Sequence, residues 1–394
     1  MVPKGWTLLQ VSDICKLQNG NSFKPHEWDT QGLPIIRIQN LNGSDNYNYF
    51  SGVPQDKWLV EPGQLLFSWA GTKGVSFGPF IWNGPKGVLN QHIYKVFANE
   101  NVHGHWLYLA LLHITQKIEA QAHGFKSTLL HVQKKDIDNQ FVLTPPVAEQ
   151  KKIAQILSTW DKAISVTEKL LANSQQQKKA LMQQLLTGKK RLLDENGVRF
   201  SGEWCTCTLS EVAHIIMGSS PKSEAYNDNG LGLPLIQGNA DIKCRVSCPR
   251  VYTSDITKEC TPGDILLSVR APVGTVALSQ HKACIGRGIS AIKSKRKMSQ
   301  SFLYQWFLWF EPKWCYLSQG STFESINSDD IKTLKLSVPN FEEQQKIAAV
   351  LSAADAEIST LEKKLACLRD EKKALMQQLL TGKRRVKVDE AVAE

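Results

Sequence analysis

Apolar residues recur at alternating steps of four and three along two long stretches of the chain. The row in the second stretch comprises Ile347, Leu351, Ala354, Ile358, Leu361, Leu365, Leu368, Leu375 and Leu379, with Lys372 interrupting it. Such spacing is the a/d seam of a helix that packs lengthwise against another helix. The first stretch carries a row of Ile153, Leu157, Trp160, Ile164 and Leu171, which weakens at Thr167, Ser174 and Lys178 and resumes at Leu181 and Leu185. We therefore predict two long helices that pair along their seams.

The two helical stretches are copies of one another. The block KKALMQQLLTGK occupies residues 178–189 and again residues 372–383. Around it, 27 of the 43 pairs formed by residues 149–191 and 343–385 are identical, which indicates an internal repeat. Each copy ends in Thr-Gly followed by cations. This ending predicts a left-handed glycine cap, with positive charge at the negative pole of the helix dipole.

The segment before the first helix has the character of a mixed globular domain. Residues 33–38 and 64–69 are short apolar runs bounded by turn residues, and they predict strands. Residues 106–122 have the 3.6 period of an amphipathic helix. Pro145 and Pro146 then suit the first turn of the long helix, where proline is tolerated. Before the second long helix, Asn340 and Glu343 have the spacing of a capping box.

Residues 192–338 repeat the first globular segment more loosely. Trp204 corresponds to Trp6, residues 233–236 to 33–36, residues 262–266 to 62–66, and residues 330–331 to 136–137. The matched residues are strand apolars, turn Pro-Gly pairs and a tryptophan, which build a scaffold. What lies between them differs almost completely, so the two copies share a fold and differ in their loops.

This order gives an α+β fold with two globular α/β domains and two long helices. The predicted segments are a first globular domain at 1–144, a first helix at 145–191, a second globular domain at 192–338, a second helix at 339–385 and a charged tail at 386–394. If the seams pair within one chain, the helices are antiparallel and the globular domains are related by a pseudo-twofold axis. About 40 residues at a rise of 1.5 Å make a rod of roughly 60 Å.

Composition narrows the class of protein. The formal net charge is +10, which suggests a polyanionic partner such as nucleic acid. The chain has no apolar run of 18 residues and no secretory leader, so we expect no membrane association and a cytoplasmic protein. Its nine cysteines are then expected to be reduced, and they lack the paired CxxC spacing of a structural zinc site. No metal site is predicted.

Three functional readings remain open at this point. A coiled-coil scaffold joining two protein-binding modules explains the helices but not the charge or the diverged loops. An enzyme would need a site, and the sequence shows no phosphate-binding P-loop, no complete GxGxxG and no Asn-Pro-Pro-Tyr-type methyltransferase motif. A reader of a two-part DNA target accounts for both the duplicated scaffold and the diverged polar loops, because duplex DNA has matching local twofold symmetry.

Polar loop residues are the candidates for DNA contact. In the first globular domain these are Arg37, Gln39, Asn40, Asn42, Asn90, Gln91, His92, Lys126, Lys134 and Lys135. In the second they are Gln237, Asn239, Arg270, Arg287, Lys293 and Lys295. Arginine reads guanine O6 and N7, and Asn or Gln reads adenine N6 and N7. The lysines are better assigned to phosphates.

The whole chain resembles the specificity subunits of type I restriction–modification systems. The most specific likeness lies at the two helix starts, PPVAEQKKIA at 145–154 and PNFEEQQKIA at 339–348, and at the Leu-Leu-Thr-Gly-Lys ends. Weaker likeness lies in residues 62–66, 262–266 and Gly320-Ser321-Thr322, and the last adds Thr322 to the DNA candidates. The first domain has Gly124-Phe125-Lys126-Ser127-Thr128 instead, so its equivalent loop is undefined.

The resemblance implies a function and a set of partners. Each globular domain would be a target recognition domain that reads one half of a split double-stranded DNA sequence. The chain would be non-catalytic and carry no cofactor. It would recruit two methyltransferase subunits, which use S-adenosylmethionine to methylate adenine N6 after flipping the base. Restriction subunits that use ATP and Mg would join the complex.

Four glutamines beside the repeated Leu-Leu pairs are candidates for docking these partners. They are Gln183, Gln184, Gln377 and Gln378. They lie off the seam, yet they are identical in both copies. Identity left over from a recent duplication is the competing explanation.

Overall fold

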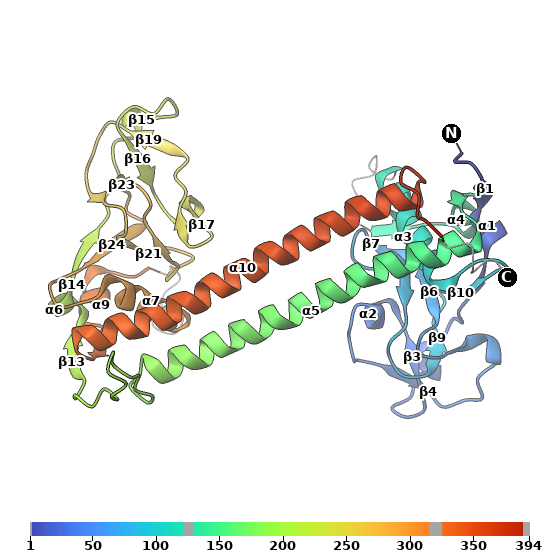
Figure 1. Ribbon diagram of the computed structural model, residues 1–394, viewed down its shortest axis with the longest axis horizontal. Coiled ribbons are helices and arrows are strands. Elements are labelled where there is room, and N and C mark those ends of the chain that lie inside the picture. Colours follow the sequence, from blue (N-terminus) through green and yellow to red (C-terminus); the bar gives the residue numbers. More distant parts are fainter. Residues whose placement is uncertain (1, 122–128, 315–324, 389–394) are drawn as a thin grey trace. The chain divides into compact units, whose positions relative to one another are not determined.

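The computed structural model describes residues 2–121, 129–314 and 325–388. The chain divides into two compact units. Unit 1 comprises Met1–Thr167 and Lys364–Glu394, and unit 2 comprises Glu168–Lys363. Each unit therefore contains one globular domain, part of helix α5 (Val147–Leu185) and part of helix α10 (Phe341–Leu380), which Figure 1 shows in green and red.

Unit 1 folds its globular domain around two four-stranded sheets. Its strands are β1 (Thr7–Gln10), β2 (Cys15–Asn19), β3 (Leu33–Ile36), β4 (Asn48–Phe50), β5 (Leu59–Val60), β6 (Leu65–Ser68), β7 (Ala70–Thr72), β8 (Gly78–Ile81), β9 (Gly87–Leu89), β10 (Ile93–Ala98), β11 (Leu129–His131) and β12 (Phe141–Thr144). Its further helices are α1 (Val11–Ile14), α2 (Ile38–Leu41), α3 (Gly104–Gln121) and α4 (Lys134–Asp138), with 3-10 turns at Pro25–Glu27 and Asp56–Trp58. The sheets have the orders β2-β10-β6-β8 and β4-β3-β9-β5, and β1-β12 and β11-β7 form separate ribbons.

Unit 2 repeats this plan. Its strands are β13 (Cys205–Thr208), β14 (Ala213–Met217), β15 (Tyr226–Asn227), β16 (Leu233–Ile236), β17 (Ile242–Lys243), β18 (Val246–Ser247), β19 (Val251–Thr253), β20 (Glu259–Cys260), β21 (Ile265–Ser268), β22 (Val276–Leu278), β23 (Ala283–Ile285), β24 (Ile289–Ser294) and β25 (Lys335–Val338). Its further helices are α6 (Leu209–Val212), α7 (Gln300–Phe310) and α9 (Ser328–Lys332), with 3-10 turns at Ser223–Ala225, Asn239–Asp241 and Glu311–Lys313. The orders β14-β24-β21-β22 and β19-β16-β23-β20 match the two sheets of unit 1, and unit 2 adds strands at their edges.

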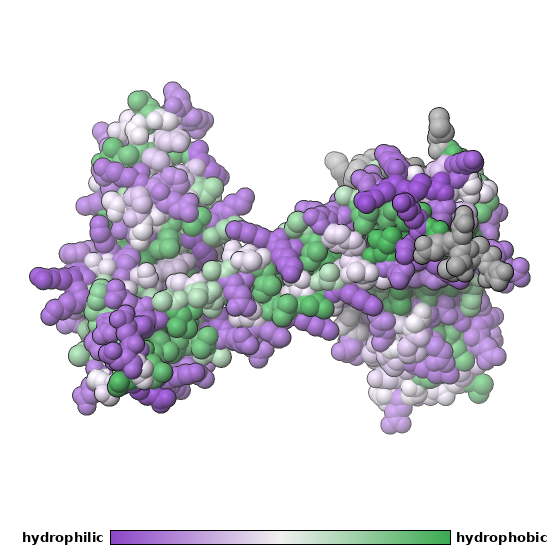
Figure 2. Space-filling view, viewed as in Figure 1, coloured by the Kyte–Doolittle hydropathy of each residue, from purple (hydrophilic) through white to green (hydrophobic). Residues whose placement is uncertain are grey.

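The ends of the long helices are built into the cores of the globular domains. In unit 1, Leu157 and Leu379 belong to the same buried cluster as Trp106 of α3. In unit 2, Leu185 and Leu351 share a cluster with other buried apolar residues, mainly of α7 and the β21–β24 sheet. Burial of these side chains removes apolar surface from water, which is the main stabilising contribution to such a core. Figure 2 shows hydrophilic side chains over much of the visible face of both units.

Ion pairs within each unit establish the antiparallel order of the helices. In unit 2, Arg191 binds Glu343 and Lys178 binds Asp355. In unit 1, the corresponding residues of the repeat pair in the same way. Arg385 binds Glu149, and Lys372 binds Asp161. The lysines that interrupt the predicted seams are therefore paired across the helices.

The helix ends follow the sequence pattern, with one difference. Gly188 and Gly382 adopt φ values of 70° and 67°, as the predicted left-handed caps require. Asn340 Oδ1 accepts the N–H of Glu343 at 2.9 Å, as a capping residue does. The Glu343 carboxylate, however, accepts two hydrogen bonds from Arg191. The predicted capping box is therefore supported in its Asn340 half, and Glu343 serves the helix pair.

The predicted strands and helices of the first globular domain are confirmed in outline. The runs at 33–38 and 64–69 form β3 and β6, each shorter than its apolar run. The helix predicted at 106–122 is α3, which begins two residues earlier. Within the described residues, no helix is both long enough and apolar enough to cross a membrane.

Candidate nucleic-acid interface

Each unit brings three loops together at the carboxyl ends of a parallel strand pair. In unit 1, β3 and β9 are parallel, and the Asn90 N–H donates to Ile36 O at 3.0 Å. In unit 2, β16 and β23 are parallel, and the Gly286 N–H donates to Ile236 O at 2.9 Å. We call the loops at these ends the strand-end surface of each unit. It comprises residues 37–42, 69–70 and 90–92 in unit 1, and residues 237–239, 269–270 and 286–288 in unit 2.

The strand-end surface of unit 2 is hollowed. The hollow has a volume of about 300 Å³ and is lined by Ser220, Tyr226, Gln237, Gly238, Asn239, Arg270, Ala271, Arg287 and Gly288. Four of the residues predicted to contact DNA thus meet at one place, although they come from three separate loops. Both arginines are exposed, and neither has an ion pair among the residues that the structure describes.

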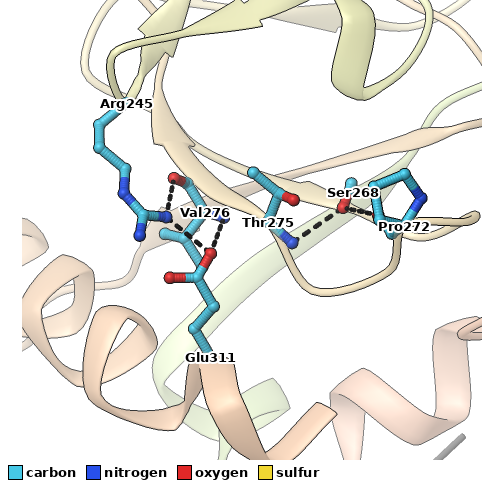
Figure 3. A network of polar contacts seen from close by, with 6 residues as sticks. All are labelled: Arg245, Ser268, Pro272, Thr275, Val276 and Glu311. Atoms are coloured by element: carbon cyan, nitrogen blue, oxygen red, sulfur yellow. Dashed lines mark hydrogen bonds and ion pairs between the residues drawn. The ribbon is translucent and has the colours of Figure 1, made fainter. Parts of the chain in front are cut away.

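The turn that carries Arg270 is held by hydrogen bonds at its base (Figure 3). The buried hydroxyl of Ser268 donates to Pro272 O at 2.8 Å and accepts the N–H of Thr275 at 2.9 Å. Just beyond, the Val276 N–H donates to Glu311 at 3.2 Å, and Arg245 donates to Val276 O at 3.1 Å. Arg245 also binds Glu311 at 2.6 Å, and this hydrogen bond raises the pKa of Arg245.

The loop that carries Arg287 packs closely against Gln237 on both flanks of the arginine. A Cβ on Gly288 would lie 2.3 Å from Gln237 O, and a Cβ on Gly286 would lie 3.2 Å from the Gln237 Cα. The Gln237 segment is itself fixed, because the buried Asp241 carboxylate accepts its N–H at 2.8 Å. Arg287 therefore projects from a backbone in a defined position.

The strand-end surface of unit 1 has different side chains on the same backbone plan. The guanidinium of Arg37 lies over the ring of Trp28, with 5.3 Å from Cζ to the ring centroid. Gln91 and His92 follow Asn90, whose Oδ1 accepts the Gln91 N–H at 2.5 Å. All three are half-buried.

An aromatic cluster lies beside these residues. The ring centroid of Trp69 is 5.2 Å from that of His92 and 4.7 Å from that of His131. The indole N–H of Trp69 donates to Gln91 O at 3.1 Å and so holds the loop. Burial, and then the neighbouring His131, lower the pKa of His92. Trp69 and His131 carry no local signal in the sequence, because their contact joins residues far apart along the chain.

Asn40 has a structural role that differs from the predicted base contact. Its side chain is 5% exposed. Its Oδ1 accepts the Arg37 N–H at 2.9 Å, and its Nδ2 donates to Ser44 O at 2.8 Å and to Asn46 O at 3.1 Å. With both ends of the amide engaged, Asn40 shapes the loop. Gln39 is exposed and donates to Asn46 O at 2.9 Å, and Asn42 is exposed at the end of α2.

The four described lysines that were predicted to contact phosphates lie outside the strand-end surfaces. Lys293 and Lys295 lie at and just after the far end of β24, opposite to the end that adjoins Arg287. Lys293 is exposed, whereas the Lys295 ammonium donates to Ser210 O at 2.5 Å, which ties it to its own domain. Lys134 and Lys135 lie in α4, where Lys134 pairs with Asp138 at 2.5 Å. Lys126 and Thr322 lie outside the described residues.

The four candidate docking glutamines are exposed. Gln183 and Gln184 follow the buried Met182 of α5, and Gln377 and Gln378 follow the buried Met376 of α10. The two copies therefore turn the same residues to solvent.

The sequence of this chain is similar to those of known proteins. A sequence model described as the type I restriction modification DNA specificity domain matches residues 3–173 and 201–368. Over 410 residues the chain is 32% identical to the type I restriction enzyme MjaX specificity subunit of Methanocaldococcus jannaschii, with 98% of this chain and 95% of that protein covered. Identity to the EcoBI specificity subunit of Escherichia coli is 24%, with 91% and 81% covered.

Two known structures share the fold. A chain from a structure described as the basis of complex assembly and conformational transition of the type I R-M system matches with a TM-score of 0.62 and 24% identity, over 98% of this chain and 100% of that one. The type I restriction–modification S subunit from M. genitalium matches with a TM-score of 0.61 and 17% identity, over 96% of both chains.

Proposed function

Because the chain belongs to the family of type I restriction modification DNA specificity proteins, we propose that it selects a two-part DNA target, with one half read by each unit. The observation that carries this proposal is the repeated strand-end surface. The two units keep the same backbone hydrogen bonds at this surface and differ in its side chains. A shared scaffold with divergent polar side chains is what two different half-sites require.

The proposed partners follow from the family. The chain would dock two methyltransferase subunits and restriction subunits, and it would itself be non-catalytic. The exposed glutamines at 183, 184, 377 and 378 are the proposed docking residues on the helices. S-adenosylmethionine, ATP and Mg would be bound by those partners.

Mapping of methylated adenines tests the proposed function. The chain is co-expressed with its methyltransferase subunits in cells that lack other adenine methylation, and the methylated sites are sequenced. We expect one motif with two specific halves separated by a nonspecific spacer. A single continuous motif, or no motif dependent on this chain, would refute the proposal and favour the scaffold alternative.

Docking is tested separately from DNA reading. Gln183, Gln184, Gln377 and Gln378 are replaced together by Glu, and assembly with the methyltransferase is followed by size-exclusion chromatography. The matched control replaces Gln175, Gln176 and Gln177, which are also exposed on α5. We expect only the first variant to lose assembly. If both variants assemble equally well, the four glutamines are not part of the docking surface.

A further inference from the structure

The hollow at the strand-end surface of unit 2 has the chemistry of a guanine reader. We infer that Arg270 and Arg287 each read the guanine of a G·C base pair from the major groove, so that the half-site of unit 2 contains such pairs. This inference rests on the proposed function, and it adds which half-site holds the G·C pairs and which residues recognise them. A guanidinium donates two parallel hydrogen bonds to guanine O6 and N7, a match that no other base offers in that groove.

The two arginines are available for such a contact. Both are exposed, both line the same hollow, and neither has an ion pair among the described residues. Elsewhere in unit 2, Arg191, Arg245 and Arg250 each bind a carboxylate. An arginine that an acid already holds is poorly placed to bind a base. Arg270 and Arg287 line the hollow with no such partner among the described residues, so their donors are available to a base.

The backbone under both arginines is held in place before DNA binds. Ser268 closes the turn of Arg270, and the close approach of Gly288 to Gln237 fixes the loop of Arg287 (Figure 3 shows the first of these). The two loops are also joined, because the Val269 N–H donates to Gly288 O at 2.9 Å. Bidentate recognition needs this kind of fixed geometry, since its selectivity depends on placing two donors at once.

Arginines also bind phosphates, so the alternative is a contact that carries no sequence information. Two observations favour the base. First, Gln237 and Asn239 line the same hollow, and amides of this kind pair with adenine edges. Second, the equivalent positions of unit 1 hold Ala70 and Gln91 in place of Arg270 and Arg287. A contact to the uniform phosphate backbone gives no reason for the two units to differ here.

Selection of target sequences by the assembled complex tests the inference. The chain, in complex with its methyltransferase subunits, is incubated with a library of duplexes randomised across the target, and bound sequences are compared among variants. For the wild type we expect a guanine in the half-site of unit 2. For Arg287→Ala and for Arg270→Ala we expect discrimination at a guanine position to fall by about 10-fold to 100-fold, with the other half-site unchanged.

Three further variants separate base reading by unit 2 from phosphate binding, from misfolding and from reading by unit 1. Arg287→Lys keeps the charge but not the bidentate fork, so it should lose guanine discrimination while retaining most of the affinity. Lys293→Ala is the matched control from the far end of β24, and it should leave the preferred sequence unchanged. Arg37→Ala should alter the half-site of unit 1 alone.

Each alternative outcome has a definite meaning. Uniform weakening of Arg287→Ala across all sequences, or full discrimination by Arg287→Lys, would assign the arginine to a phosphate and overturn the inference. A wild-type motif whose unit 2 half lacks G·C would also overturn it, while its two-part form would leave the proposed function standing. A motif without two halves would refute the proposed function itself.

Discussion

The buried ion pair at the start of α10 allows a quantitative test of how the helices are held to the domains. Arg191 donates from Nε and Nη2 to the two Glu343 oxygens at 2.7 and 2.6 Å. The Glu343 side chain is 0% exposed and that of Arg191 is 19% exposed. In the equivalent pair of unit 1, Glu149 is 11% exposed and Arg385 is 41% exposed. The same chemistry thus occurs at two levels of burial in one chain.

Arg191→Ala should destabilise unit 2 more than Arg385→Ala destabilises unit 1, because it leaves the fully buried Glu343 carboxylate without its cation. Removing one partner of a buried ion pair leaves an uncompensated charge and costs about 3–5 kcal/mol. Loss of hydrogen bonds to a charged group that water can still reach costs roughly 1.5–3 kcal/mol. In a unit of this size, the larger loss corresponds to a fall in Tm of about 6–20 °C.

Calorimetry and hydrogen exchange together measure this difference. Calorimetry gives the fall in Tm, and amide exchange shows which unit has opened. The control is the double variant Arg191→Ala with Glu343→Ala, which should be more stable than Arg191→Ala alone because no charge is left unpaired. The reasoning would be refuted if Arg385→Ala cost as much as Arg191→Ala, or if the double variant were the least stable.

Three further predictions follow from the loops, the histidines and the helices. Gly288→Ala should reduce sequence discrimination in the half-site of unit 2 and leave the other half-site unchanged, because the added Cβ would lie 2.3 Å from Gln237 O. Selection from a randomised DNA library checks this. Burial lowers the pKa of His113 in α3 below 6.5, so the unfolded chain binds a proton that the folded chain excludes. Unit 1 should therefore lose stability as the pH falls below about 6.5. The His113→Gln variant should lose less stability over this pH range than the wild type or the variant His214→Gln, which changes an exposed histidine as a control. Thermal melts at several pH values measure the difference. Four residues, about one helical turn, can be inserted into both helices, after Thr167 in α5 and after Lys363 in α10. These insertions keep the ion pairs between the helices within each unit. Sequencing of methylated sites should then show a changed spacer between unchanged half-sites.

Local patterns in the sequence were sufficient to predict the helices and their ends. The a/d spacing depends on neighbours three and four residues apart, and a glycine cap depends on one residue with positive φ. For this reason the paired helices and the caps at Gly188 and Gly382 agree with the prediction. The repeat also indicated that both globular domains share a scaffold, and the matching sheet orders of the two units bear this out.

What each polar side chain does was decided only by the tertiary structure. Asn40 and Gln39 are neighbours with similar chemistry, yet Asn40 is buried as the cap of its own loop while Gln39 is exposed. Lys293 and Lys295 differ in the same way, because only Lys295 reaches a backbone carbonyl. A hydrogen-bond partner can lie anywhere in the chain, so residue type and local pattern do not reveal it.

The sequence by itself determined a duplicated scaffold with two paired helices, and it identified most of the polar residues that line the hollow of unit 2. Only the fold decided that Gln237, Arg270 and Arg287 meet there, since parallel pairing of β16 with β23 joins segments about 50 residues apart. The fold also placed Trp69 and His131 side by side in unit 1. Helical periodicity depends on residues close together in the sequence. A site made of several loops depends on strand pairing, which joins residues far apart in the sequence.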